Sequence, residues 1–484
     1  MNEKIKDITE IEKKVPLKSK IAYGYGCGAI NVLGNIAFSS ITYFYNTIIG
    51  LNAVLIGLVW LIFAAWNAIN DPLFGALGDK TKSRFGRRIP YIRFGAPIFG
   101  LLFIFIWLPL YNPSNEWAIF IYLLVILFAF DSIYSVITLS FFILPAEMSI
   151  SAKSRANILV YGNLIGALGT GISLIVPVLF LTGKSDLESV LPFLITMIIF
   201  GIIFSLLLFT ASYNLYENKF TQIQEPLGFI EGFKETMKNK AYLIYVGSQF
   251  FWVLSNTILT TGVIYYVQYI LNLEGIGSII PLLCIFGMLI VFAFIVDPLL
   301  SRLGPKKFYT YSLLLHSLSF LVLFFTGWTL QTALVTLMFL GLTVASALII
   351  GGVLNGEVLD YDELKTGKRR EATYSGVNAL VLKPAISIAN FIFLITINFF
   401  GFQEKSRIQS DEALLGIMVA FTILPAIFLL VSALIMSFFP LEGPEWKQQK
   451  LKIAKIHEEK EKEYKSYLKE KSKNIKKKQD KTTS

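Results

Sequence analysis

Asp71 and Pro72 lie deep inside an apolar run that extends from about residue 53 to residue 78. An ionised carboxylate at the centre of a membrane costs about 3 kcal/mol or more, so it is retained where it lines a water-filled cavity, pairs with another group or binds an ion. The neighbouring proline removes a backbone hydrogen bond, which other groups must replace. Together the two residues indicate a polar pathway through an apolar environment.

Further polar side chains interrupt other apolar runs, at spacings that place them on shared helix faces. Asn31 and Asn35 are four residues apart, as are Tyr374 and Asn378, and residues with this spacing lie on one face of a helix. Amides and a phenol suit the hydroxyl groups of a neutral polyol, although amides also join membrane helices to each other. We expect a substrate site that draws on Asn31, Asn35, Asp131, Asn256, Tyr374, Asn378 and Lys383.

Lys383 is a basic residue well inside an apolar run, which extends from about residue 373 to residue 402. A buried ammonium group needs a partner, because without one it would lose its proton or destabilise the fold. We expect Asp71 or Asp131 to supply the counter-charge, with substrate or cation exchanging for it during a transport cycle.

Twelve apolar runs must position these residues. Hydrophobic residues make up 55% of the 484 positions and charged residues 16%, whereas soluble domains are about a quarter charged. A helix crosses a bilayer in about 20 residues. The sequence therefore predicts an all-α polytopic membrane protein with twelve transmembrane helices, at about residues 21–49, 53–78, 91–111, 116–148, 156–182, 188–213, 241–271, 277–300, 307–328, 332–359, 373–402 and 411–439.

Lys and Arg gather in alternate loops between these runs and in both terminal segments. Because basic residues favour the cytoplasmic side, we expect a multi-pass protein of the cell membrane with both termini cytoplasmic. The basic tail holds few aromatic residues that could stack on bases, so nucleic acid is not an expected partner. Cys27 and Cys284 have no disulfide or metal-site spacing.

The chain divides into two related halves. Residues 71–80 match residues 297–306 at six of ten positions, and each copy ends the second run of its half. Tandem halves are typical of transporters that hold substrate between them, and we find no catalytic constellation, so an enzyme is not expected. The expected divisions are an N-terminal arm at 1–20, six-helix halves at 21–213 and 241–440, a loop at 214–240 and a basic tail at 441–484.

Two segments carry a family resemblance. The stretch from Trp66 to Pro90 includes a loop from Gly75 to Arg88 that resembles a signature of the major facilitator superfamily. With Asp360 to Gly376, it resembles the glycoside–pentoside–hexuronide:cation symporters within that superfamily. The resemblance implies the major facilitator fold and alternating-access symport of a sugar or glycoside with a cation, with no cofactor beyond a co-transported proton or sodium ion. We expect a monomer.

The resemblance also implies a cation site on the second run, where the family has the pattern Asp-x-x-Asn-Asp. This chain has Asn67, Asn70 and Asp71 at those positions, so one carboxylate is replaced by an amide. Fewer hard oxygen ligands remain for sodium, whereas one buried carboxylate can still carry a proton. We expect proton-coupled or uncoupled transport with little dependence on sodium.

Charged residues at the predicted cytoplasmic ends of both halves suggest a gate. Opposite charges across such a seam could favour one conformation by about 1–3 kcal/mol. The residues expected to form this gate are Asp79, Arg87 and Arg88 in the first half, and Asp360, Asp362, Arg369 and Arg370 in the second.

Two alternatives remain open at this stage. The polar residues equally suit the headgroup of a lysophospholipid or another amphiphile, which transporters of the same fold also carry. A receptor or scaffold without transport activity could instead act through its basic tail. Removing residues 445–484 should leave transport intact but abolish a function that depends on the tail.

Overall fold

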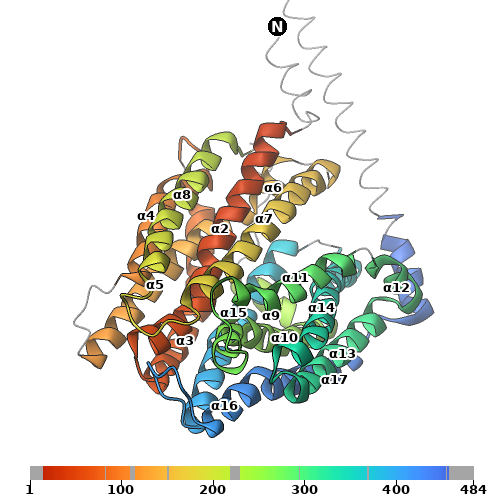
Figure 1. The fold of residues 1–484 in the computed structure, drawn as a ribbon. Coiled ribbons are helices and arrows are strands. Elements are labelled where there is room, and N and C mark those ends of the chain that lie inside the picture. Colours follow the sequence, from red (N-terminus) through yellow and green to blue (C-terminus); the bar gives the residue numbers. More distant parts are fainter. Residues whose placement is uncertain are drawn as a thin grey trace, which may run out of the picture.

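The computed structural model describes residues 15–81, 83–108, 115–149, 152–217, 229–293, 295–367, 370–453 and 455–456. Helices account for the regular structure throughout this part of the chain, and they form the two expected sets (Figure 1). The first set is α2 (Leu17–Tyr43) with its π-helical continuation η1 (Phe44–Ile49), α3 (Ala53–Lys80), α4 (Ile89–Trp107), α5 (Glu116–Phe142), α6 (Leu144–Met148), α7 (Ala152–Leu181) and α8 (Leu191–Asn214).

The second set begins with a short helix inside the segment expected to be a loop. It comprises α9 (Phe229–Met237), α10 (Lys240–Tyr265) with its π-helical continuation η3 (Tyr266–Ile270), η4 (Gly275–Ile279), α11 (Ile280–Ala293), α12 (Val296–Leu303), α13 (Pro305–Thr326), α14 (Leu330–Thr366), α15 (Glu371–Phe399), α16 (Asp411–Met418), η5 (Val419–Ile423) and α17 (Leu424–Ser437).

The twelve predicted crossings are confirmed, with one difference in the eighth. Eleven helical segments of the described chain are long and apolar enough to span a membrane, and residues 275–288 form a shorter apolar helix. The predicted eighth helix, 277–300, is broken between α11 and α12. Pro298 lies in the first turn of α12, where its missing N–H leaves no helical hydrogen bond unmade, so this proline favours a new helix start over continuation of the old one.

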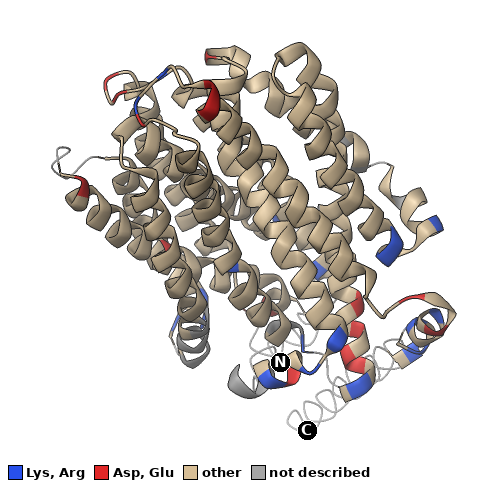
Figure 2. Cartoon of the chain, turned by 90° about the horizontal axis from the view of Figure 1, so that it is seen from below, with Lys and Arg blue, Asp and Glu red and all other residues tan. Residues whose placement is uncertain are grey.

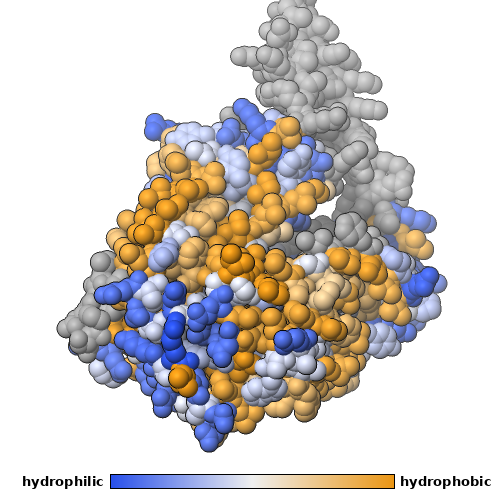
Figure 3. All heavy atoms as spheres, viewed as in Figure 1, coloured by the Kyte–Doolittle hydropathy of each residue, from blue (hydrophilic) through white to orange (hydrophobic). Residues whose placement is uncertain are grey.

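The surface fits a membrane environment. Charged residues gather at the two ends of the bundle and are sparse along its middle (Figure 2). Large apolar side chains such as Leu168, Ile202 and Leu434 are more than half exposed, and apolar surface covers much of the flank (Figure 3). A soluble protein rarely exposes apolar patches of this size, whereas lipid tails accept them.

Close packing between α2 and α7 explains two glycines of the first run, Gly24 and Gly28. A Cβ atom added at Gly169 would lie 2.6 Å from the backbone oxygen of Gly28, so neither helix could keep its position. Small residues at membrane-helix contacts allow this approach. Across the two halves, the most extensive contact joins α3 to α15.

Part of the C-terminal segment packs onto the second half. Residues 443–453 are helical. Trp446 is buried and lies edge-on to Tyr361, with 6.0 Å between the ring centroids, and Lys450 forms an ion pair with the buried carboxylate of Glu357. Glu442 pairs with Lys306 at 3.0 Å, and this hydrogen bond lowers the pKa of the Glu442 carboxyl. A deletion that tests the role of the tail should therefore begin after this helix rather than at residue 445.

We predict that deleting residues 457–484 leaves thermal stability in detergent unchanged, whereas Lys450→Ala lowers it. Loss of the lysine leaves Glu357 buried without its counter-charge, and the expected cost is about 1–2 kcal/mol because Lys450 itself is partly exposed. Lys452→Ala is the matched control, since Lys452 is exposed on the same helix. Equal melting temperatures for the two lysine variants would contradict this reading.

Candidate substrate and coupling site

A buried polar cluster joins three helices from both halves. Asn70 on α3 donates through Nδ2 to Asp131 Oδ2 and, at 3.2 Å, to Ser135 Oγ, both on α5. Lys383 on α15 donates through Nζ to the same Ser135 oxygen at 2.8 Å. Asn70, Asp131 and Ser135 are each at most 1% exposed. The cluster therefore connects the two halves deep inside the protein.

Helical spacing explains why these residues meet. Asp131 and Ser135 are four residues apart on α5, so both face the same neighbours. Asp131 was one of two carboxylates expected near Lys383, and in the structure Asn70 binds Asp131 and Ser135, while Lys383 binds Ser135. Ser135 itself was missed, because a serine within a largely apolar helix gives little sequence signal beyond its spacing from Asp131.

Several buried polar atoms, some on α3 and others in the second half, have no hydrogen-bond partner among the described residues. On α3 they are the Asn70 and Asn67 side-chain oxygens and the Trp66 indole N–H. The second half contributes Trp252 Nε1, Ser255 Oγ, Asn378 Oδ1 and Ser387 Oγ. Unpaired buried polar atoms are rare and each needs an explanation. Binding of a polar ligand to these donors and acceptors would explain them. Trp66 also presents an aromatic ring, which is stacked on Phe128.

Asn31 and Asn35 do not join the cluster. Asn31 Nδ2 donates to the Gly166 backbone oxygen at 3.0 Å and to Thr170 Oγ1 at 3.4 Å, and Asn35 Nδ2 donates to the same threonine at 3.4 Å. These bonds tie α2 to α7. They favour the interhelical role for both amides over the predicted substrate contact.

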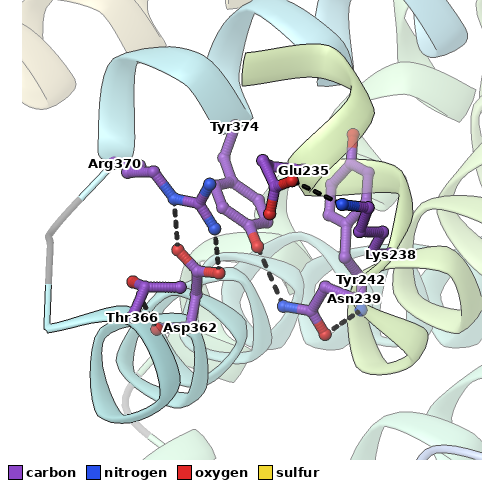
Figure 4. Close-up of polar contacts among 8 residues, drawn as sticks. All are labelled: Glu235, Lys238, Asn239, Tyr242, Asp362, Thr366, Arg370 and Tyr374. Atoms are coloured by element: carbon purple, nitrogen blue, oxygen red, sulfur yellow. Dashed lines mark hydrogen bonds and ion pairs between the residues drawn. The ribbon is translucent and has the colours of Figure 1, made fainter. Parts of the chain in front are cut away.

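Tyr374 belongs to a second polar group, at the end of the bundle where the described chain begins. Its hydroxyl accepts a bond of 2.9 Å from Asn239 Nδ2, and its ring lies edge-on to Tyr242 (Figure 4). Asp362 binds Arg370 through two hydrogen bonds beside it (Figure 4), which raises the pKa of the Arg370 guanidinium. Tyr374 is thus placed with the predicted gate residues rather than with Lys383, nine residues further along α15.

Two other predicted substrate residues, Asn378 and Asn256, have no hydrogen bond to the Ser135 cluster among those described. Asn378 Nδ2 contacts Asn355 Oδ1 at 3.5 Å, which joins α15 to α14. Asn256 is half-buried on α10. Asp71 and Asp79 are helical, but their side chains lie outside the described structure, as does the whole of Arg369. The roles predicted for these three residues therefore stay predictions.

The predicted gate residues form pairs within each half. Arg87 Nη2 binds Glu147 Oε1 at 2.6 Å, and Arg88 Nε approaches the same oxygen at 3.4 Å. Glu217 accepts the backbone N–H groups of residues 87–89 at 2.7, 2.7 and 3.0 Å, which suits a carboxylate at the start of a helix. Asp360 is half-buried at the same end of the bundle. A latch between halves stays a prediction for another state of the protein.

Hydrogen bonds between the halves occur at the opposite end of the bundle. Asn390 Oδ1 accepts from Thr42 Oγ1 at 3.0 Å and from Thr261 Oγ1 at 3.1 Å, so one amide oxygen binds both halves. Tyr265 donates to Asn46 Oδ1 at 3.0 Å. Further contacts run from the Gly183 N–H to Gln268 and from the Ala53 N–H to Glu404.

The sequence analysis did not predict this junction between the halves around Asn390, although equivalent tyrosines of the two halves lie there. Tyr43 and Tyr265 occupy the ends of α2 and α10, immediately before the π-helices η1 and η3, and their rings meet edge-on at 4.9 Å. The two residues are 222 positions apart, close to the offset of 226 between the repeated segments. The same element of each half therefore supplies the closure.

Sequence comparison decides the class of this chain. Residues 22–443 match the family model described as MFS/sugar transport protein. The chain belongs to this family. It is a membrane transporter of the major facilitator superfamily rather than an enzyme, and the resemblance to glycoside–pentoside–hexuronide:cation symporters agrees with the match.

Relatives of this transporter carry symporter names. Uncharacterized symporter YnaJ of Bacillus subtilis is 29% identical over 455 residues, covering 91% of this chain and 95% of its own. The putative glycoside/cation symporter YagG of Escherichia coli is 22% identical, covering 88% and 93%. The crystal structure of a D-xylose–proton symporter superposes with a TM-score of 0.62 at 14% identity, covering 87% and 97%, which supports the fold.

We predict that Asn390→Val weakens closure at the end where Asn390 lies. The change leaves the Thr42 and Thr261 hydroxyls without their shared acceptor, and a buried unpaired polar group costs about 1–3 kcal/mol. Labelling of a cysteine placed at Asn46 by an impermeant maleimide should become several-fold faster. Asn398→Val, at the end of the same helix, is the control, and equal labelling in both variants would argue against a gate at Asn390.

Proposed function

We propose that this transporter moves a sugar or glycoside together with a cation by alternating access. The cluster of Asn70, Asp131, Ser135 and Lys383 carries the proposal, because it places charged and polar groups at the seam where two halves can separate. The buried donors and acceptors that have no partner among the described residues suit hydroxyl groups. The names of the relatives support the same substrate class.

We further propose a proton as the coupling ion. Asp131 accepts an N–H from Asn70, which also binds Ser135. The ammonium group of Lys383 binds the same serine. A sodium ion needs several oxygen ligands directed toward it, as hard cations do, and a neighbouring ammonium repels it. A proton needs one carboxylate oxygen.

The bundle end that carries residues 15–17 and 438–453 would be cytoplasmic, as the basic loops predict. Asn390 and its partners would then close the outer side, so the present conformation suits exchange with the cytoplasm. The protein would act as a monomer, since each half supplies part of one central site.

Reconstitution tests this function. Purified protein in liposomes should exchange labelled D-xylose, methyl β-D-glucoside or methyl β-D-glucuronide in counterflow, and should concentrate at least one of them when the outside is made acidic. A sodium gradient alone should have little effect. Exchange of lysophosphatidylglycerol without exchange of any sugar would favour an amphiphile transporter, and exchange of none would favour the receptor or scaffold.

We predict that Lys383→Ala reduces concentrative uptake at least tenfold while the protein remains folded in the membrane. The variant removes the ammonium group that binds Ser135 from the other half, so the charge balance at the seam is lost. Lys240→Ala, which removes an exposed lysine at the start of α10, is the control. Near-normal accumulation by Lys383→Ala would exclude a role for this ammonium group in coupling.

A further inference from the structure

Two buried acceptor atoms of α3, one of them in the central cluster, have no donor among the described residues, and their residues lie about one helical turn apart. Asn70 Oδ1 and Asn67 Oδ1 are both buried without a hydrogen-bond partner. Residues three apart on a helix are neighbours on its surface, with Cβ atoms about 5–6 Å apart. Each unpaired buried acceptor costs about 1–3 kcal/mol. In the present arrangement, therefore, two neighbouring acceptor oxygens have no hydrogen-bond donor among the described residues.

One added proton and one amide rotation would satisfy both atoms. If Asp131 becomes neutral, its carboxyl O–H can donate to Asn70 Oδ1 once the Asn70 amide turns by about 180°. The Asn70 NH₂ group then faces the other way, toward Asn67 Oδ1, which accepts its N–H. A carboxylate accepts only, whereas a neutral carboxyl donates, and an amide offers both chemistries.

We propose that Asp131, rather than Asp71, carries the transported proton, and that Asn70 with Asn67 stabilises its neutral form. This inference rests on the proposed proton-coupled transport. A proton from water on one side forms an O–H bond with an Asp131 carboxylate oxygen, and the same bond breaks when the proton leaves to water on the other side. Asn67, which stands where the family pattern has a carboxylate, thereby gains a use as an acceptor.

Lys383 links this proton to the movement of the halves. Its ammonium group is the described charged group that approaches the cluster from α15, and it is held there by Ser135 at 2.8 Å. From α3 the facing groups are the neutral amides of Asn70 and Asn67, and the Asp71 side chain lies outside the described structure. A nearby positive charge disfavours the neutral carboxyl. Separation of α15 from α5 would therefore favour proton uptake, and their approach would favour release.

Infrared spectroscopy of the purified protein tests the assignment without any sugar. The wild-type protein should show a carboxyl C=O stretching band that disappears as pH rises, and Asp131→Asn should remove that band while Asp71→Asn retains it. Persistence of the band in Asp131→Asn, or its loss in Asp71→Asn, would overturn the proposal.

Asn67→Leu provides a second test that does not require Asp131 to be replaced. Without the Asn67 acceptor the neutral form of Asp131 is less stable, so the midpoint of the band should move to lower pH by about one unit, the equivalent of one lost hydrogen bond. Asn31→Leu is the control, because Asn31 binds α7 instead. An unchanged midpoint in Asn67→Leu would overturn the role of Asn67.

Uptake measurements separate this proposal from the transport function itself. If the wild-type protein concentrates neither D-xylose nor any of the methyl glycosides under a proton gradient, the proposed function fails, whatever the infrared result. If wild-type protein does so and Asp131→Asn still concentrates the same sugar, the assignment of the proton fails alone. Exchange without accumulation in Asp131→Asn, together with retained accumulation in Asp71→Asn, supports both.

Discussion

Polar atoms buried at the seam between α3, α5 and α15 need hydrogen-bond partners, and the cluster around Ser135 leaves Asn70 Oδ1 without one among the described residues. Ser135 Oγ accepts from Lys383 of one half and from Asn70 of the other. In a low-dielectric interior such a network is costly when incomplete. A change of hydrogen-bond partners at this seam would therefore lower the free energy of the cluster.

The two ends of the bundle are built differently. Where Asn390 lies, one amide oxygen holds Thr42 and Thr261 from opposite halves, and neutral hydroxyl–amide bonds are individually weak, at about 0.5–1.5 kcal/mol each. At the other end, charge-assisted pairs such as Arg87 with Glu147 and Arg370 with Asp362 stay within one half. Arginine–carboxylate pairs therefore rigidify each half as a unit, whereas the described bonds between the halves are mostly single hydrogen bonds, of which those to Glu404 and from Lys383 include a charged group.

Sequence patterns predicted the helices better than the contacts. Apolar length located the twelve crossings, and the eighth differs in being divided into α11 and α12, where Pro298 in the first turn of α12 favours a new helix start. Asp131 and Lys383 were recognised because charge at membrane depth needs a purpose. Asn31 and Asn35 share the same kind of signal, yet both bind α7, because an amide satisfies either a ligand or a neighbouring backbone. Spacing along one helix does not reveal which helix lies opposite.

Ser135 shows the limit of such prediction most clearly. Its hydroxyl is chemically ordinary, and its position matters only because α3 and α15, about 300 residues apart in sequence, both reach it. The replacement of the family carboxylate by Asn67 likewise gains its meaning only from residues around it. Taken alone it looks like the loss of a cation ligand, but beside Asn70 it becomes an acceptor that a neutral Asp131 can use indirectly. The meaning of either residue therefore depends on the protonation state of a carboxylate on a third helix.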